Sequence, residues 1–526
     1  MMTRTIDILH RHRVSRRDAL RLAGGVGISG ATLGAVRPGA LATQQPAGAA
    51  VPIEIIDTGA RLPTEEVTLR WISSGPGPKG IFLEQFFAAY QEAHPNITVA
   101  FEQMPWEEIG KIVPLGIQNG EAHDVFQIPQ NVPSAQAVAQ GWVAPVEDII
   151  PDFAAWQATF PPGAFVQGIT GFNGQTYTIP LSSNKRYDTL LLYNRSYLEQ
   201  AGYDPMSQPF TWDDFRAAAK KLTEQGAGQY FGLILEGKQA PRFGSFVANL
   251  AQMAGARAGS DNIDWQSGEY VYTSDQYLAA IDLLLAINAD GSFFPGSLSL
   301  NAHQARSRMP QGAAAMILQG PWNIPQWKQE APDFQFGVAS QPLANSGTPL
   351  PLGYNPGGAN HYWLYVQSEH QAIAGDILYQ LGTLETQTAW SLITGGVADP
   401  PIFPEAAAAA VDQLGPEEQK TVALFEEQLR LHPNPEVRNP EVAQVNVERK
   451  ALQPDFGQVI QGLFTGQLSD TKAAMQDLQD RADAELDRGI EAARAKGAQV
   501  SRDDWVFPNW DPTQDYTAED YAALGQ

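Results

Sequence analysis

Short apolar runs alternate with helical stretches in the first part of this chain, and this rhythm limits its fold more than any other feature. Residues 67–72 (VTLRWI) and 97–104 (ITVAFEQM) have the length and composition of buried strands. Between them, residues 81–95 place apolar side chains on one helical face and end at a proline. A helix at 107–119 and a strand at 124–128 continue the pattern. Strands separated by helices at this spacing predict a parallel sheet with right-handed crossovers.

The same rhythm returns later in the chain. Residues 188–194 (DTLLLYN) predict a strand, and residues 211–226 predict a helix with Thr211 as its N-cap. A strand at 361–367 and a long amphipathic helix at 470–497 follow. These segments predict a second α/β unit, with a mostly helical region after it.

Composition excludes several classes of function. The 526 residues include no Cys, so a disulfide, a thiolate metal site and a Cys nucleophile are all excluded. The net charge of −24 argues against a nucleic-acid partner or an anionic membrane surface. The eight His residues show no metal-binding spacing, and we predict no cofactor and no metal. The length allows two or three domains.

The first residues resemble a twin-arginine export signal. Ser15–Arg21 contains the paired arginines, residues 22–36 are weakly apolar, and Ala40–Ala42 offers an A-x-A cleavage site. The alternative is a short basic amphipathic helix, and Asp18 and Ala19 depart from the usual motif. Loss of residues 1–42, with seven Arg and two Asp, would change the net charge from −24 to −29.

No other apolar run approaches the ~18 residues that a membrane span needs. We therefore predict a soluble mature protein in the periplasm or outside the cell. Residues 43–66, rich in Ala, Gly, Pro and Gln, predict a linker.

A large aromatic ring stands at an unusual place in GAAAMILQGPWNIPQW, Gly312–Trp327. An apolar strand gives way to a Gly-Pro turn, and Trp322 follows at once. There the ring can line a cleft, or it can plug the second unit as packing. Trp327 and Trp212 are better explained by packing.

Five segments together resemble the extracellular solute-binding proteins of ABC importers, in particular the sugar-binding family of the maltose-binding type. The resemblance covers roughly residues 67–497, with LFTGQLSDTKAAMQDLQDRADAEL similar to the family's C-terminal helix region. The segments, in the family's order, are VTLRWISS to YQEAHPNITV, HDVFQI, YTIPLSSNKRYDTLLLYNRSYLEQAG, TWDDFRAAAKKL and GAAAMILQGPWNI.

The resemblance implies the type II periplasmic-binding-protein fold, with two α/β lobes, each a mostly parallel sheet flanked by helices. It places the N-terminal lobe in 67–180 plus 343–395 and the C-terminal lobe in 181–342 plus 396–497, followed by an acidic tail, 498–526. It also implies hinge closure on a sugar or polyol, a membrane permease as partner, a monomer, and no catalysis.

Candidate ligand contacts follow from the resemblance and from position. By resemblance, the Trp322 ring stacks on a sugar. The other candidates lie near strand ends, at the lobe crossing or in the returning loop, because ligands sit outside the carboxyl ends of strands in such sheets. For the Glu107–Glu108 pair, stabilisation of a helix start is an equal alternative. The candidates are Ser73, Ser74, Trp106, Glu108, Asp124, Gln130, Asn131, Tyr187, Trp322, Asn355, Gly357, Gly358 and Trp363.

Two enzymatic alternatives remain. Gly75–Gly80 fits G-x-G-x-x-G, with Glu102 22 residues after Gly80, as in a dinucleotide site of an exported oxidoreductase. Pro76 and Pro78 argue against it, because they remove two backbone donors from the loop.

A glycoside hydrolase would need two carboxyl groups across one bond. The adjacent pairs Glu107/Glu108 and Asp213/Asp214 point ~100° apart on a helix, so neither pair flanks one bond by itself.

Overall fold

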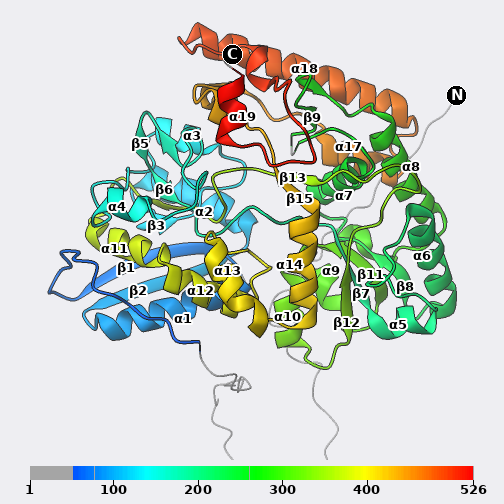
Figure 1. The fold of residues 1–526 in the computed structure, drawn as a ribbon, viewed down its shortest axis with the longest axis horizontal. Helices are drawn as coiled ribbons and strands as arrows, with labels where there is room; N and C mark the ends of the chain where they lie inside the picture. Colours follow the sequence, from blue (N-terminus) through cyan, green and yellow to red (C-terminus); the bar gives the residue numbers. More distant parts are fainter. Residues whose placement is uncertain (1–50, 76, 260, 525–526) are drawn as a thin grey trace, which may run out of the picture. The chain divides into compact units, whose positions relative to one another are not determined.

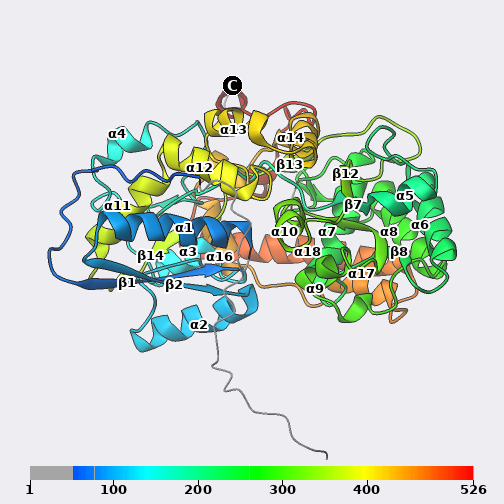
Figure 2. The ribbon, with the colours of Figure 1, turned by 90° about the horizontal axis from the view of Figure 1, so that it is seen from below.

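The computed structural model describes residues 51–75, 77–259 and 261–524. The predicted export signal, 1–42, and the first residues of the predicted linker, 43–50, lie outside this part. Two sheets organise the described residues, and Figures 1 and 2 agree that helices α1 and α12 lie with the first sheet and α6 with the second.

The first sheet has five strands in the order β2-β1-β3-β14-β6. β1 is parallel to β2 and β3, whereas β14 is antiparallel to both β3 and β6. Four strands thus share one direction and β14 is reversed. The strands are β1 (Val67–Ser74), β2 (Ile97–Met104), β3 (Val125–Phe126), β6 (Thr178–Ile179) and β14 (Tyr362–Leu364).

The second sheet has four strands in the order β12-β7-β11-β8. β11 is parallel to β8 and antiparallel to β7, which is antiparallel to β12 as well, so only β7 is reversed. Both sheets are mixed, with four of five and three of four strands sharing one direction, and together with the helices they confirm the predicted α/β class. The strands are β7 (Leu190–Asn194), β8 (Phe231–Ile234), β11 (Ala314–Gln319) and β12 (Phe336–Ala339).

The two reversed strands share one cause. β7 is the first sheet strand after the chain leaves the first lobe, and β14 is the first after it returns. The register sets Gln319, which ends β11, beside Leu190, which begins β7. Likewise Ile179, which ends β6, pairs with Tyr362, which begins β14. These two crossings therefore meet the carboxyl edges of the sheets.

Helices cover the sheets. In the first lobe they include α1 (Pro78–Ala93), α2 (Trp106–Asn119), α3 (Ser134–Ala139), α4 (Phe153–Gln157), α11 (Gln371–Leu381), α12 (Leu384–Thr394) and α13 (Pro404–Ala410). With the second sheet and after it come α5 (Arg195–Gln200), α6 (Trp212–Gly226), α7 (Ala240–Met253), α8 (Asp275–Ala289), α9 (Ala302–Arg308), α10 (Asn323–Glu330), α14 (Pro416–Gln428), α15 (Pro435–Arg438), α16 (Val442–Glu448), α17 (Phe456–Phe464), α18 (Thr471–Ala495) and α19 (Ala518–Ala523). Short two-stranded ladders pair β4 (Gly171–Phe172) with β5 (Gln175–Thr176), β9 (Ile263–Asp264) with β10 (Glu269–Tyr270), and β13 (Leu352–Tyr354) with β15 (Leu429–Leu431).

The start of α6 shows how the sequence sets an element locally. Thr211 is the N-cap, and its hydroxyl accepts from the backbone N–H of Asp214 at 3.1 Å while the Asp214 carboxylate accepts from the N–H of Thr211 at 3.2 Å. The helix ends after Gly226, where Ala227 adopts the left-handed conformation (φ 46°). The predicted cap is confirmed.

Each lobe has its own apolar core. Trp71, Phe82 and Trp390 lie in the first-lobe cluster, and Trp265 lies in the largest cluster of the second lobe. The lobe limits stay a prediction, and core contacts point to different limits at two places. Ile402 packs in the first-lobe core although 396–497 was assigned to the second, and Leu352 packs in a second-lobe core.

The predicted linker packs against the first lobe from residue 51 onward. Ile53 and Ile55 pack against the first-lobe core. The side chain of Gln380, in α11, donates to the carbonyl of Ile56 at 2.6 Å and accepts from its N–H at 3.2 Å. Residues 51–62 therefore lie along the first lobe.

The acidic tail is docked on the second lobe. Trp505 and Trp510 are 2% and 1% exposed and belong to the core of that lobe. The tail also binds the segment around β15, because the N–H of Tyr516 donates to the Leu431 carbonyl at 2.8 Å. In addition, the Tyr521 hydroxyl accepts from the N–H of Asn434 at 2.8 Å. This segment leads into α15.

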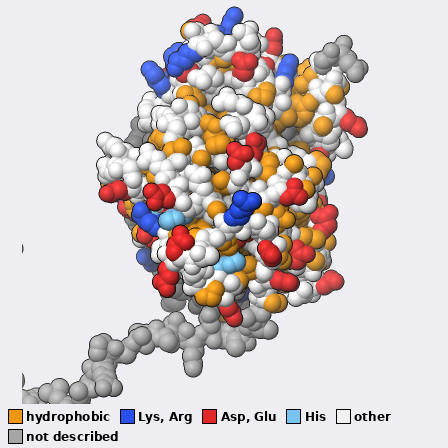
Figure 3. Space-filling model, turned by 90° about the vertical axis from the view of Figure 1, so that its left-hand side faces the viewer, with side chains coloured by type: hydrophobic (Ala, Val, Ile, Leu, Met, Phe, Trp, Pro, Cys, Tyr) orange, Lys and Arg blue, Asp and Glu red, His pale blue; other side chains and the backbone are white. Residues whose placement is uncertain are grey.

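Within the described ranges, no helix is both long and apolar enough to cross a membrane. Figure 3 shows one face of the first lobe, where acidic side chains are dispersed among neutral and apolar ones. This distribution matches the acidic composition of the chain.

We predict that Trp510→Ala lowers the free energy of unfolding by about 3 to 5 kcal/mol, because it leaves a cavity in a packed core. Urea denaturation followed by circular dichroism measures this change. The exposed neighbour Gln514 provides the control, since Gln514→Ala should shift stability by no more than about 0.5 kcal/mol. Equal effects of the two substitutions would contradict a docked tail.

Candidate functional site

The chain segments that cross between the lobes lie side by side. Asn184 donates from Nδ2 to the carbonyl of Gly358 at 2.5 Å and to that of Asn355 at 3.4 Å. The backbone N–H of Ser183 donates to the carbonyl of Pro400 at 2.8 Å. These bonds bring the crossing segments together at the carboxyl edges of the sheets, where ligands bind in folds of this kind.

On the first-lobe edge, Lys79 ties three segments together. Its Nζ donates to Ser74 Oγ at 2.7 Å, to Gln127 Oε1 at 3.1 Å and to Asn360 Oδ1 at 3.1 Å. Ser74 ends β1, Gln127 follows β3 and Asn360 precedes β14. Nζ also lies 5.9 Å from the centroid of the Trp106 ring. Burial lowers the pKa of Lys79 to about 8, although Asp399 opposes this change.

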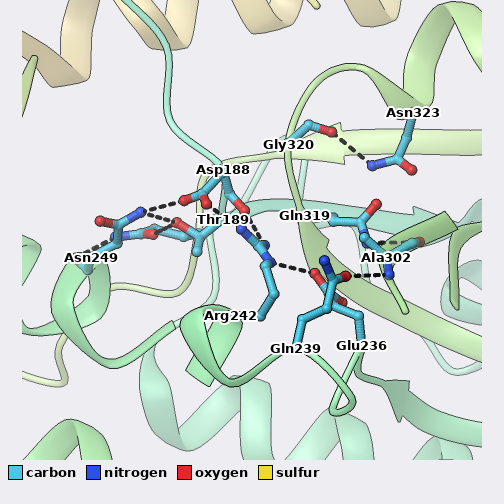
Figure 4. Close-up of polar contacts among 11 residues, drawn as sticks. Asp188, Thr189, Glu236, Gln239, Arg242, Asn249, Ala302, Gln319, Gly320 and Asn323 are labelled. Atoms are coloured by element: carbon cyan, nitrogen blue, oxygen red, sulfur yellow. Dashed lines mark hydrogen bonds and ion pairs between the residues drawn. The ribbon is translucent and has the colours of Figure 1, made fainter. Parts of the chain in front are cut away.

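On the second-lobe edge, Arg242 joins two carboxylates. Figure 4 shows it between Asp188, which precedes β7, and Glu236, which follows β8. Its Nε lies 2.6 Å from Glu236 Oε1, and a second nitrogen is ion-paired with Asp188. Although burial disfavours the Arg242 cation, the two carboxylates outweigh burial and raise its pKa.

Trp322 stands at the start of α10, on the same edge. Its ring folds over Gly320, where a Cβ would overlap the ring, so only glycine fits there. The guanidinium carbons of Arg186 and Arg306 lie 5.6 and 5.8 Å from the ring centroid. Trp322 remains partly exposed, whereas Trp327 is fully buried and packs against Phe336.

Buried polar atoms without a hydrogen-bond partner gather beside Trp322. Within the described ranges, four of them belong to this edge: Glu236 Oε2, Gln319 Oε1, Trp322 Nε1 and Asn323 Oδ1. Figure 4 shows Glu236, Gln319 and Asn323 in one region, each with its other polar atom already bonded. An unmet buried polar atom costs about 1 to 3 kcal/mol. The gathering therefore suits a polar ligand that completes these bonds.

A cavity of about 470 Å³ lies beside the crossing segments, between the lobes. Ser134 and His361 line it from the first lobe, and Trp265, Glu436 and Arg449 from the second. Burial, reinforced by the charge of Asp261, raises the pKa of Glu436 to about 7. The cavity is therefore polar and holds a carboxyl group that titrates near neutrality.

Several predicted residues lie at the facing sheet edges or line the 470 Å³ cavity. Ser74 and Trp106 contact Lys79, and Trp322 lies on the facing edge. Asn355 and Gly358 line the 470 Å³ cavity. Gln130 and Asn131 are exposed in the turn after β3, close in sequence to Pro133 and Ser134 of the cavity wall.

Other predicted residues have structural partners instead. The Ser73 hydroxyl lies 2.7 Å from the Tyr362 hydroxyl and is fully buried. Asp124 lies at the opposite, amino edge of the sheet, where its carboxylate accepts from the N–H of Arg70 at 2.8 Å and from Ser368 Oγ at 2.6 Å. These bonds explain the burial of both residues without a ligand.

Packing accounts for two aromatic candidates. Tyr187 is 5% exposed, stacks edge-on against Phe425 and donates its hydroxyl to Gln428 Oε1 at 2.8 Å. Trp363 is 3% exposed within β14 and packs near Phe172. These contacts explain the burial of both rings without a ligand.

Glu108 and Gly357 also have local explanations. Glu108 pairs with Lys111 at 2.7 Å on the surface of α2, which favours the helix-start alternative. Gly357 has φ 83°, and its N–H donates to the carbonyl of Gly163 at 2.8 Å. A left-handed turn therefore requires glycine at this position.

Packing explains two of the three glycines in the Gly75–Gly80 loop. A Cβ at Gly80 would overlap the side chain of Gln103, and a Cβ at Gly75 would lie 2.5 Å from Gln103 Oε1. The glycines thus make room for a neighbouring strand. Asp214 caps α6, so the Asp213/Asp214 pair marks a helix start.

Sequence reasoning missed several polar residues at the facing edges. Gln319 and Asn323 flank the Gly-Pro-Trp turn. Their place at a strand end could have predicted them as ligand contacts, because strand ends face the cleft. The partnership of Lys79 with Asn360, and of Arg186 with Asp399, joins segments more than 200 residues apart. No local sequence pattern predicts such pairs.

The raised pKa of Glu436 leads to a pH-dependent prediction. The folded protein holds this proton more tightly than the unfolded chain, whose pKa is near 4.5. The contribution to stability is therefore complete below about pH 4.5 and is lost as the pH rises through about 7. Glu436→Gln should stabilise the protein relative to the native sequence more at about pH 8 than at about pH 5. Urea midpoints at the two pH values test this.

The exposed Glu92 supplies the control for this series, because Glu92→Gln should shift the midpoint equally at both pH values. A pH-independent effect of Glu436→Gln would show that the carboxyl group titrates at its ordinary pKa.

Known proteins share the sequence pattern and the architecture of this chain. The family model of bacterial extracellular solute-binding proteins matches residues 75–378. A putative binding protein of Brucella abortus is 26% identical over 284 residues, which cover 53% of this chain and 64% of that protein. The multiple sugar-binding protein of Streptococcus mutans is 21% identical over 294 residues, 52% of this chain and 61% of that protein. The match thus spans less than two thirds of these relatives' own length.

A solved structure shares the fold. The GacH receptor of Streptomyces glaucescens, determined unliganded and in complex with acarbose, superposes with a TM-score of 0.62 at 16% identity, over 80% of this chain and 99% of that one. This likeness confirms the predicted two-lobe binding-protein fold. Because the family model matches more than half of its residues, the chain belongs to the bacterial extracellular solute-binding protein family.

Proposed function

We propose that this chain is the substrate-binding component of an ABC importer. It captures a carbohydrate, as a mono- or oligosaccharide or a polyol, between its lobes and delivers it to a membrane permease. It acts as a monomer, reaches the periplasm or the cell exterior by the twin-arginine route, and has no nucleic-acid partner. The name of the S. mutans protein and the acarbose complex of the S. glaucescens receptor support the choice of carbohydrate.

The unmet polar atoms beside Trp322 are the observation that carries this proposal. A sugar has hydroxyl groups that both donate and accept, and flat C–H faces that suit an aromatic ring. Glu236 Oε2, Gln319 Oε1 and Asn323 Oδ1 are acceptors, and Trp322 Nε1 is a donor. A hydroxylated ligand supplies the complement of this set.

We further propose that binding proceeds without catalysis. A glycosidase keeps two carboxyl groups available on either side of the bond. Here Glu236 and Asp188 are both ion-paired with Arg242, and Asp399 is ion-paired with Arg186.

Trp322→Ala should abolish stabilisation by a sugar. In a thermal-shift screen of sugars and polyols, a ligand at 100 times its dissociation constant adds about 2.7 kcal/mol to the stability of the native protein. The variant loses the ring and the Nε1 donor, so its melting temperature should not respond to the same ligand.

A second tryptophan provides the matched control. Trp142 is also partly exposed but follows α3, next to Val143, which pairs with Tyr365 just after β14 and so away from the facing edges. Trp142→Ala should keep the ligand response. A screen in which only nicotinamide cofactors shift the native protein would instead favour the enzymatic alternative at Gly75–Gly80.

Ligand should also change the arrangement of the lobes. Hinge closure brings the two lobes together, so the radius of gyration from small-angle X-ray scattering should fall when the sugar found by the screen is added. An unchanged radius at saturating sugar would contradict capture by closure.

A further inference from the structure

Cations gather at the facing sheet edges of a strongly acidic protein. The chain carries a net charge of −24. Lys79 nevertheless stands on the first-lobe edge, and Arg186 and Arg306 both lie within 6 Å of the Trp322 ring. Arg186 and Lys79 are close enough for Arg186 to lower the pKa of Lys79.

Arg306, in α9, is ion-paired with none of the residues that the structure describes. Its Nε donates to the carbonyl of Ala302 at 3.2 Å and its Nη1 to Gln326 Oε1 at 3.1 Å. Of the carboxylates that the structure describes, none lies within 4 Å of this guanidinium. Burial lowers the pKa of Arg306 to about 10, although the charge of Glu236 opposes this change. The cation is thus held in an environment that disfavours it.

Lys79 is in a similar position. Its three hydrogen bonds go to a hydroxyl and two amide oxygens, all of them neutral. Among the described carboxylates, none is ion-paired with it. Because its three N–H donors are all in use, Lys79 acts on a ligand through its charge alone.

The nearby carboxylates are already engaged. Asp399 is ion-paired with Arg186. Glu236 and Asp188 share Arg242. Glu330, whose charge also raises the pKa of Arg306, accepts from the side chain of Gln326. Lys79 and Arg306 are thus the two cations of this region that no described carboxylate approaches within 4 Å. A ligand with a negative group would supply these two cations with a counter-charge, whereas a neutral sugar would not.

We propose that the ligand is a hydroxylated anion, a sugar or polyol that carries a carboxylate or a phosphate. Its anionic group lies beside Trp322, between the guanidinium groups of Arg186 and Arg306. Its hydroxyl groups donate to the unmet oxygens of Glu236, Gln319 and Asn323. This inference rests on the proposed function and names its substrate class.

Matched ligand pairs test the charge directly. Isothermal titration of the mature protein with glucose, glucuronate and glucose 6-phosphate compares a neutral sugar with its carboxylate and phosphate forms. We expect at least one anionic form to bind about tenfold or more tightly than glucose, as for a charged hydrogen bond. Its affinity should fall several-fold between about 50 mM and about 500 mM NaCl, while that for glucose should not. Inorganic phosphate alone should bind more weakly than the preferred sugar anion.

Substitution of Arg306 locates the anionic group. Arg306→Gln should weaken the preferred anion about tenfold and leave glucose affinity unchanged, and Arg306→Lys should retain part of the preference. Arg308 lies in the same helix but over Phe294, so Arg308→Gln is the matched control and should change neither affinity. The melting temperature of each unliganded variant shows whether it folds.

The possible failures are distinct. If glucose or another neutral sugar binds as tightly as both anions, or if Arg306→Gln weakens neutral and anionic sugars alike, the charged ligand is overturned and the proposed function stands. Inorganic phosphate binding as tightly as glucose 6-phosphate overturns the requirement for hydroxyl groups. If no sugar, sugar acid or sugar phosphate binds at all, the proposed function fails as well.

Discussion

The rest of this structure depends on where the polypeptide crosses between its sheets. The first two crossings meet the carboxyl edges, so the next strand must begin at that edge and run against its neighbours. This single requirement reverses β7 and β14 and turns the polar ends of the other strands toward the crossing segments. The amino edges, such as that at Asp124, are left to structural hydrogen bonds. The lobe architecture and the position of the site thus have one common origin.

The polar groups at the facing edges differ in whether their hydrogen bonds are complete within the protein. Lys79 has all its donors satisfied and holds β1, β3 and the returning strand in register. Glu236, Gln319 and Asn323 each keep one oxygen unmet. The first arrangement stabilises the lobe, whereas the second is incomplete within the protein itself. This contrast distinguishes residues that stabilise the sheet edge from residues that are available to bind a ligand.

Sequence reasoning recovered the fold because periodicity is a local property. The strands at 67–72 and 97–104, the cap at Thr211 and the long helix after Asp470 all follow from neighbouring side chains, and all are present. The site was harder, since successive strand residues face opposite sides. Ser73 turns inward to Tyr362 while Ser74 meets Lys79.

Charge partnerships were harder still. Arg186 meets Asp399, and Arg306 approaches Trp322 from another helix, through the tertiary fold alone. The tail after residue 497 matched no pattern, yet its aromatic side chains proved to be core residues. Exposure of large aromatic rings to water is costly, and that general cost was the available hint.

The docked tail connects the far end of the chain to the region between the lobes. Tyr516 and Tyr521 hold the backbone at Leu431 and Asn434, and Asn434 and Glu436 line the 470 Å³ cavity. Natural variation in residues 510–521 can therefore reshape this cavity without altering any residue in its wall. A biosensor built from this chain should accordingly carry its fluorophore elsewhere, because a label on the tail would perturb the cavity that it is meant to report.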